Sequence, residues 1–257
     1  MRIDVQIDAA RVAHVTVCHA RKLNTLNRAL MAEFVSAFDE LSRDDSLRAV
    51  ILRGEGERAF IGGADIREMA ALDASSARDF ITHVHRCCAA VRDVPVPVIA
   101  RLAGYTLGAG LEIAASCDLR IAAESAQFGM PEVKLGIPSV VEAALLPPLI
   151  GWGRARRLLL LGETISAAQA ESWGLVEQVS SELDADVAKW VAAIVECGPR
   201  AIRLQKKLMR QWEDLPLSAA IEAGIDAFEA SYASDEPRQM MQRFLRGAAS
   251  RGGKPAV

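Results

Sequence analysis

Hydrophobic and polar residues alternate twice near the start of the chain and then change to a helical spacing. Residues 3–7 and 12–17 alternate apolar and polar side chains, which predicts two short strands joined by a turn. In residues 26–41 the apolar side chains recur at helical spacing, after Asn24 and Thr25 as candidate cap residues. The pattern therefore predicts a β-hairpin followed by an amphipathic helix.

Apolar runs without alternation follow in the middle of the chain. Residues 49–52 and 96–102 are short runs that each lead to a glycine, and both are typical of buried parallel strands. Residues 76–91 have the length of a helix between them, and residues 119–122 form a further apolar run. A strand, helix, strand order predicts an α/β fold with a mostly parallel sheet.

The last part of the chain has a helical pattern. Only residues 176–179 suggest a strand there, and the predicted helices cover residues 154–161, 166–173, 186–195, 201–212, 217–232 and 238–244. We expect a core at residues 1–195 and a C-terminal helical region at 196–257, with residues 197–199 (Cys-Gly-Pro) as a candidate hinge.

Composition and charge exclude several classes of protein. The 257 residues are 51% hydrophobic and 25% charged, as in globular proteins rather than disordered or collagenous ones. The net charge is -3 without a block of like charges, so we expect neither nucleic acid nor an anionic membrane as a partner. The longest uncharged stretch, residues 143–153, is far below the roughly 20 apolar residues that span a bilayer.

The five cysteines bear on the cellular compartment. Their number is odd, they are widely spread, and they contain no C-x-x-C motif, a pattern typical of reduced thiols. The first residues lack the apolar core of a secretory signal. We therefore expect a cytoplasmic protein.

Common catalytic motifs are absent from the sequence. It contains no G-x-S-x-G, no G-x-x-x-x-G-K-[ST] and no H-E-x-x-H motif. The one candidate metal cluster consists of His83, His85, Cys87 and Cys88, but its spacing fits no standard zinc pattern. A plain helix surface is the preferred interpretation, and we expect no metal.

Two glycine-rich segments, residues 59–69 and 104–112, each follow a buried strand and lead into a helix. Such bends leave backbone N–H groups unpaired, so two bends side by side could offer two donors to one oxyanion. Asp65 and Glu68 have the spacing of a capping box. The alternative is that both segments are simply tight turns.

Four motifs in register resemble those of the crotonase, or enoyl-CoA hydratase/isomerase, superfamily. They are Gly62-Gly63-Ala64-Asp65-Ile66, Gly104-Tyr105-Thr106-Leu107-Gly108-Ala109-Gly110-Leu111-Glu112, Cys117-Asp118 and Ala126-Gln127-Phe128-Gly129-Met130-Pro131-Glu132. The resemblance begins in the first strands and ends near Val179. It implies a spiral of strand-strand-helix units, a C-terminal helical region that packs in a trimer or a dimer of trimers, and acyl-CoA thioester substrates. CoA would be part of the substrate, with no separate cofactor.

The resemblance also assigns roles to individual residues. The backbone N–H groups of Ala64 and Ala109 would form an oxyanion hole, and Glu112 and Glu132 would be an acid/base pair. The residues expected at the CoA site are Lys22, Leu23, Gly62, Ala64, Asp65, Ile66 and Gly108. Without the resemblance, Glu112 could be a first-turn glutamate stabilised by the helix dipole, and Glu132 and Lys22 could be solvated loop residues.

Departures from the family pattern at Ala109 and at residues 135–142 qualify this hypothesis. Ala109 stands where the family usually has glycine, which leaves the N–H donor in place if φ is negative. Residues 135–142 replace a glycine-rich stretch, and Ser139 and Glu142 there have the spacing of a capping box. We expect Glu142 to cap this helix, with a third active-site carboxylate as the alternative.

The sequence thus predicts an enoyl-CoA hydratase. Family members that only isomerise double bonds generally lack the first glutamate, so Glu112 favours hydration. Two alternatives stay open at this point. They are an enoyl-CoA isomerase that uses Glu132, and a non-catalytic family member that acts as a binding module.

Overall fold

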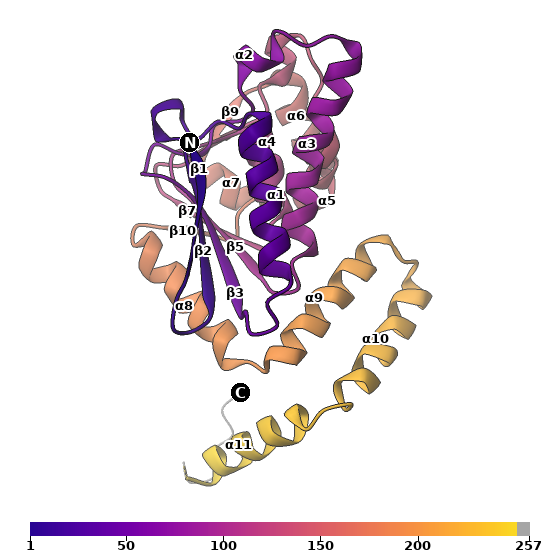
Figure 1. Ribbon diagram of the computed structural model, residues 1–257. Helices are drawn as coiled ribbons and strands as arrows, with labels where there is room; N and C mark the ends of the chain where they lie inside the picture. Colours follow the sequence, from indigo (N-terminus) through magenta and orange to yellow (C-terminus); the bar gives the residue numbers. More distant parts are fainter. Residues whose placement is uncertain (251–257) are drawn as a thin grey trace. The chain divides into compact units, whose positions relative to one another are not determined.

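A six-stranded sheet runs through the N-terminal part of the protein (Figure 1). The computed structural model describes residues 1–250. The strands follow the order β1 (Arg2–Ile7), β2 (Val12–Cys18), β3 (Ala49–Gly54), β5 (Val98–Leu102), β7 (Leu119–Ala123) and β10 (Gln178–Ser180). Strands β1 and β2 pair antiparallel, whereas all other neighbours pair parallel. The predicted hairpin and the mostly parallel sheet are confirmed.

A second, four-stranded sheet consists of shorter strands. Its order is β4 (Ala59–Ile61), β6 (Tyr105–Leu107), β8 (Gln127–Gly129) and β9 (Thr164–Ser166), of which only β9 is antiparallel to its neighbour. Strands β3, β5 and β7 of the first sheet are each followed by one short strand of the second sheet and then by a helical segment. This repeat is the predicted strand-strand-helix unit.

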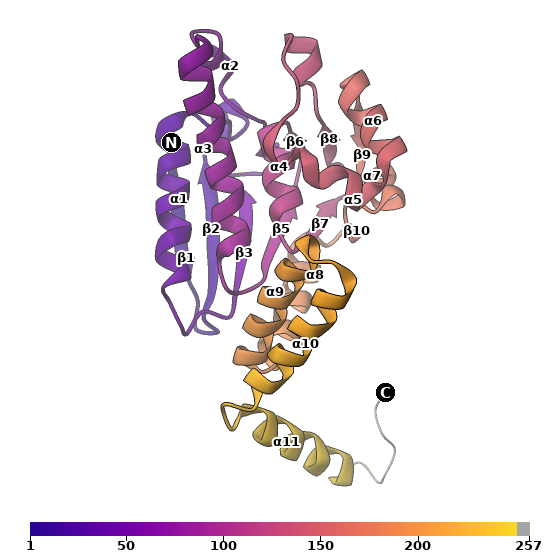
Figure 2. The ribbon, with the colours of Figure 1, turned by 90° about the vertical axis from the view of Figure 1, so that its right-hand side faces the viewer.

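Helices α1 (Arg28–Ser42) and α3 (Ala74–Asp93) lie side by side over one face of the large sheet (Figures 1 and 2). Phe34 and Phe38 of α1 stack in the core with ring centroids 4.7 Å apart. The predicted cap of α1 is wrong, because Asn27 accepts from the N–H of Leu30 at that position. Asn24 is buried and ties its loop to β4 through the carbonyl oxygen of Ala59.

The chain divides into two compact units, residues 1–191 and a unit that begins at Ala192, with the division inside α8 (Leu183–Glu196). The second unit contains α9 (Pro199–Asp214), α10 (Leu217–Ser231) and α11 (Glu236–Ser250), as the helical pattern predicts. Helices α9 and α10 pack together, and the indole N–H of Trp212 donates to the carbonyl oxygen of Ala220 over 2.9 Å. Residues 251–257 of the predicted C-terminal region lie outside the described residues. Within residues 1–250, no helix has both the length and the apolar character needed to cross a bilayer.

Candidate active site

A pocket of about 570 Å³ lies in the first unit, where β4, β6 and β8 end. This volume is within the range of small-molecule sites. Apolar side chains make up much of its wall, among them Ile66, Phe80, Ile81, Leu135, Ile137 and Val140. The carboxyl groups of Glu112 and Glu132 also line it, so the pocket combines an apolar wall with two acidic groups.

The ends of three neighbouring parallel strands supply the polar groups of this pocket. Ala64 follows β4, Ala109 follows β6, and Glu132 follows β8. Because β6 pairs parallel with both β4 and β8, the carboxyl ends of all three strands meet at one edge of the small sheet. Segments more than 60 residues apart in the sequence are thereby brought to one site.

Glycines shape the two turns that carry the alanines. Gly62 approaches Leu23 so closely that a Cβ on Gly62 would lie 2.9 Å from the Leu23 carbonyl oxygen. The Gly62 N–H donates to that same oxygen over 2.8 Å. Gly108 has φ 52° and ψ -124°, a conformation that residues with a Cβ rarely adopt. Both turns thus depend on glycine for a specific geometric reason.

The backbone N–H groups of Ala64 and Ala109 are available to a ligand. Neither donates a hydrogen bond to any other group within the described part of the chain. Ala109 is the first residue of α4 (Ala109–Ser116), so its N–H is one of the donors that a helix leaves unpaired at its start. Its φ is not positive, which leaves the donor intact despite the departure from glycine. The structure brings both predicted donors into one pocket.

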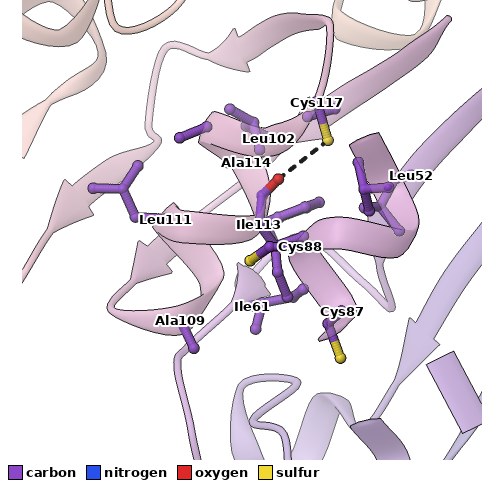
Figure 3. Close-up of a cluster of buried hydrophobic side chains, with 14 of the residues drawn as sticks. Leu52, Ile61, Cys87, Cys88, Leu102, Ala109, Leu111, Ile113, Ala114 and Cys117 are labelled. Carbon is purple, nitrogen blue, oxygen red and sulfur yellow. Dashed lines mark hydrogen bonds between the residues drawn. The ribbon is translucent and has the colours of Figure 1, made fainter. Parts of the chain in front are cut away.

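Helix α4, which carries Glu112, is buried along its whole length, and Figure 3 shows buried side chains of other elements around it. Ile113 and Ala114 lie among buried side chains from other elements, including Ile61 and Cys88. The thiol of Cys117 contacts the carbonyl oxygen of Ile113 over 3.4 Å at the end of the helix. Close packing of this kind permits little movement of the helix that carries Glu112.

Glu112 is only 4% exposed, and its environment favours the protonated form. Burial, together with the negative charges of Glu132 and Glu142, raises the pKa of Glu112 to about 8. Backbone N–H groups of Ala143 and Val140 partly oppose this shift. Glu112 therefore carries its proton at neutral pH.

Glu132 begins the short 3-10 helix η2 (Glu132–Leu135) in a more polar environment. The Ser139 hydroxyl donates to Glu132 Oε2 over 2.8 Å. On the other side, a Cβ on Gly108 would lie 2.4 Å from Glu132 Oε1. The two glutamates thus share a pocket but have different surroundings, which is how one acid and one base arise from the same residue type.

The predicted capping role of Glu142 is wrong. The 3-10 helix η3 (Val141–Leu145) follows Val140, and no side chain caps it. Ser139 uses its hydroxyl for Glu132, and Glu142 Oε1 lies 2.7 Å from Nδ1 of His85 on α3. The sequence interpretation missed the contact between His85 and Glu142, because nothing in the local pattern relates two residues 57 positions apart.

Of the residues expected at the CoA site, Gly62, Ala64, Ile66 and Gly108 line the pocket, whereas Lys22, Leu23 and Asp65 are not among its lining residues. Lys22 Nζ is 3.2 Å from Asp65 Oδ2, and Asp65 caps α2 (Ile66–Met69) through the N–H of Arg67. Ile66 is 58% exposed beside the first glycine turn. The predicted capping box is not formed, because Asp65 accepts from the N–H of Arg67 rather than of Glu68, and Glu68 accepts from the N–H of Arg28.

The four residues of the candidate metal cluster on α3 contact different parts of the protein. His83 Nδ1 contacts the carbonyl oxygen of Asp79 on its own helix, whereas His85 contacts Glu142. Cys87 and Cys88 are buried, and burial raises the pKa of the Cys87 thiol to about 12. In residues 1–250, no three His, Cys, Asp or Glu side chains are grouped to hold a metal ion.

Comparisons with known proteins agree with this geometry. The sequence profile of the enoyl-CoA hydratase/isomerase family matches residues 8–249. The chain is 35% identical over 248 residues to a short-chain-enoyl-CoA hydratase of Clostridium acetobutylicum, covering 95% of each protein. It is 34% identical over 238 residues to a crotonyl-CoA hydratase of Syntrophomonas wolfei, covering 91% of this chain and 92% of that protein.

Solved structures give the same result for the fold. The structure of an enoyl-CoA hydratase from Bacillus anthracis superposes with a TM-score of 0.89 at 31% sequence identity. The match covers 100% of this chain and 99% of the Bacillus anthracis chain. The structure of an enoyl-CoA hydratase from Mycobacterium smegmatis superposes with a TM-score of 0.92 at 27% sequence identity. The match covers 95% of this chain and 96% of the Mycobacterium smegmatis chain. The predicted crotonase-like fold is thereby confirmed, and the chain belongs to the enoyl-CoA hydratase/isomerase family.

Proposed function

We propose that this protein is an enoyl-CoA hydratase, which adds water reversibly to a 2-enoyl-CoA thioester. The observation that carries the proposal is the presence of Glu112 and Glu132 in one pocket with two unpaired backbone N–H groups. The relatives named short-chain-enoyl-CoA hydratase and crotonyl-CoA hydratase support the same reaction. CoA would enter as part of the substrate, and the reaction as proposed requires no separate cofactor.

The mechanism follows from the positions of these groups. The thioester oxygen would accept hydrogen bonds from the N–H groups of Ala64 and Ala109, which stabilise the negative charge that develops on it. Glu132 would take a proton from water as the water oxygen bonds to C3. Glu112 would give its proton to C2, and the proton held by Glu132 must return to Glu112 through solvent before the next cycle.

A survey of 2-enoyl-CoA substrates of increasing chain length tests the proposal. We expect at least one of them to lose the absorbance of its conjugated thioester and to form the 3-hydroxyacyl product. Migration of the double bond without hydration would support the isomerase alternative that uses Glu132. Binding of acyl-CoA without any turnover would support the binding-module alternative.

We also assign the CoA end of the substrate to the pocket edge at the first glycine turn. Lys22 is about half exposed and is held there by Asp65, so its ammonium group could meet a phosphate as a point charge. The other residues proposed for this site are Leu23, Gly62, Ala64, Asp65, Ile66 and Gly108. The proposed partner is thus an acyl-CoA thioester, with neither nucleic acid nor membrane as a further partner.

The proposed location is the cytoplasm. All five cysteines lie in the described part of the chain, and none of them forms a disulfide bond there. Thiols persist in reducing compartments.

The proposed assembly is a homotrimer or a dimer of trimers. Helix α10 exposes Leu217, Ile221, Ile225 and Phe228, with Phe228 68% exposed. Exposed apolar surface of this extent marks association surfaces in soluble proteins. We expect light scattering at micromolar concentration to give three or six times the chain mass, and Phe228→Glu to lower it. A monomeric mass for the unaltered protein would contradict the proposal.

A further inference from the structure

Arg120 is a buried arginine for which the mechanism above gives no role. It lies on β7, and its side chain is only 5% exposed. The guanidinium group donates to backbone carbonyl oxygens of two different segments and pairs with the carboxylate of Glu177. Because an arginine stays charged and offers only donors, burying one is costly unless acceptors surround it. The acceptors that Arg120 contacts therefore indicate what this buried charge does.

Two of these acceptors lie at the C-terminal end of α4. Nη1 of Arg120 donates to the carbonyl oxygen of Cys117 over 2.7 Å and to that of Ala114 over 3.3 Å. The last carbonyl groups of a helix lack partners further along the helix and carry partial negative charge. The last turn of α4 contains no basic residue of its own, so the positive charge at this end comes from β7.

The remaining contacts of Arg120 hold its guanidinium group to the large sheet. Nε donates to the carbonyl oxygen of Leu175 over 2.9 Å, and Nη2 pairs with the Glu177 carboxylate. Leu175 and Glu177 belong to the segment that leads into β10, which pairs parallel with β7. The backbone N–H of Arg120 also donates to Glu177. Arg120 thus connects the end of α4 to two strands of the sheet.

The start of α4 has no comparable attachment through a cap. Gly108 precedes the helix and provides no side-chain cap, and the mechanism leaves the Ala109 N–H for the thioester oxygen. Since the carbonyl groups of a helix point along its axis, hydrogen bonds to the last of them restrain the helix along that axis. A shift of α4 along its axis would displace the Ala109 N–H at its start.

We propose that Arg120 is a positioning residue, which anchors α4 at its C-terminal end and thereby fixes the place of the Ala109 N–H in the oxyanion hole. The inference rests on the oxyanion role proposed for Ala109. Arg120 is not among the lining residues of the pocket, so it acts on the reaction through the helix that it holds. A displacement of about 1 Å in a reacting geometry can cost about 100-fold in rate.

Arg120→Lys tests this inference because it keeps the charge but not the geometry. A single ammonium group cannot reach the carbonyl oxygens of both segments and Glu177 in the way that the planar guanidinium does. We expect kcat to fall by about 10- to 100-fold. The KM for the CoA thioester should change little, because the pocket wall is unaltered.

The absorbance band of a bound conjugated thioester reports directly on the oxyanion hole. Hydrogen bonds to the thioester oxygen polarise the conjugated system and move its band to longer wavelength. We expect 2,4-hexadienoyl-CoA to show this shift when mixed with the unaltered protein and a smaller shift with Arg120→Lys. A lower kcat with an unchanged band shift overturns the inference, because the loss would then not come from the oxyanion hole.

Arg101→Lys is the matched control. Arg101 lies on β5 and is 4% exposed, as Arg120 is, but in the described part of the chain its side chain pairs with Glu57 and Asp184 rather than with α4. Both lysine variants should lower the Tm, whereas only Arg120→Lys should lower kcat and reduce the band shift. Equal kcat values and equal band shifts in the two variants overturn the inference. Should Arg120→Lys fail to fold, Glu177→Gln, which loosens Arg120 without removing it, takes its place with the same expected directions.

Hydrogen exchange of α4 in the free protein gives a readout that requires no substrate. The amides of residues 109–116 should exchange faster in Arg120→Lys than in the unaltered protein or in Arg101→Lys. Equal exchange in all three proteins overturns the anchoring role of Arg120. If the unaltered protein neither hydrates an enoyl-CoA nor shifts the band, the proposed function fails, but this exchange still decides whether Arg120 anchors α4.

Discussion

Replacing Glu112 or Glu132 by glutamine is expected to lower kcat by at least about 100-fold, because general acid or base catalysis contributes about 10²–10⁴ in rate. Glutamine has about the same size as glutamate. Its amide cannot donate the proton that position 112 would supply, and it cannot accept the proton that position 132 would take. The KM for the CoA thioester should change little, since the amides of Ala64 and Ala109 and the apolar wall remain. Loss of the conjugated thioester absorbance measures the effect.

The matched control for these variants is Glu124→Gln, which alters an exposed glutamate in the turn between β7 and β8. It should retain full activity. Full activity in Glu112→Gln or in Glu132→Gln would remove that residue from the mechanism. If Glu112→Gln loses hydration but still moves the double bond, the isomerase alternative is favoured.

Thermal stability separates loss of chemistry from loss of structure in Glu112→Gln. The pKa of Glu112 is raised to about 8 in the folded protein, so the unfolded chain loses this proton at lower pH than the folded protein does. The free energy of unfolding therefore decreases as the pH rises from the usual pKa range of a glutamate toward 8, because the folded protein holds this proton and the unfolded chain does not. Glutamine removes this cost, and we expect Glu112→Gln to have a higher Tm than the unaltered protein at pH 8.5.

Gly108→Ala is expected to lower kcat by about 100-fold or more, the loss typical when one oxyanion donor is displaced. The new Cβ would lie 2.4 Å from Glu132 Oε1, so the carboxylate must move away. The backbone at φ 52° and ψ -124° is also strained for alanine, at about 1–3 kcal/mol. If the backbone relaxes to relieve that strain, the Ala109 N–H changes its direction. The substitution would therefore displace both the proposed base, Glu132, and the proposed oxyanion donor, the Ala109 N–H.

Gly151→Ala controls for the backbone strain alone. Gly151 has φ 79°, but nothing lies within 4 Å of the position its Cβ would take. It precedes α6 (Trp152–Leu161) and is not part of the pocket wall. Both variants should lower the Tm, whereas only Gly108→Ala should lower kcat. Equal activity of the two variants would show that the fit between Gly108 and Glu132 has no catalytic importance.

The sequence predicts the long elements well because each has enough residues to establish a period. The alternation in β1 and β2 and the helical spacing of α1 extend over six or more residues each. The strands of the small sheet have three residues each, too few for a pattern to distinguish a strand from a loop. The glycine motifs located the turns after two of these strands, but not the sheet that joins them.

The candidate site shows a similar division. The turn that carries Ala64 and the helix start that carries Ala109 are encoded by adjacent glycines, so local sequence was sufficient to suggest them. The interpretation of Glu142 failed because it rested on spacing to Ser139 alone. Which partner each side chain takes is decided by the packing of η3 between α3 and α4, and tertiary packing of this kind leaves no local signature.

The placement of the polar groups after three separate strands has a consequence for how such a site can change. The proposed amide donors follow the ends of β4 and β6, whereas the proposed base follows the end of β8. Substitution of the residue after β8 leaves the backbone of the other two turns untouched. The scaffold can therefore be reprogrammed one turn at a time: the amide pair would continue to stabilise enolates of thioesters while a new side chain after β8 directs them to a different product.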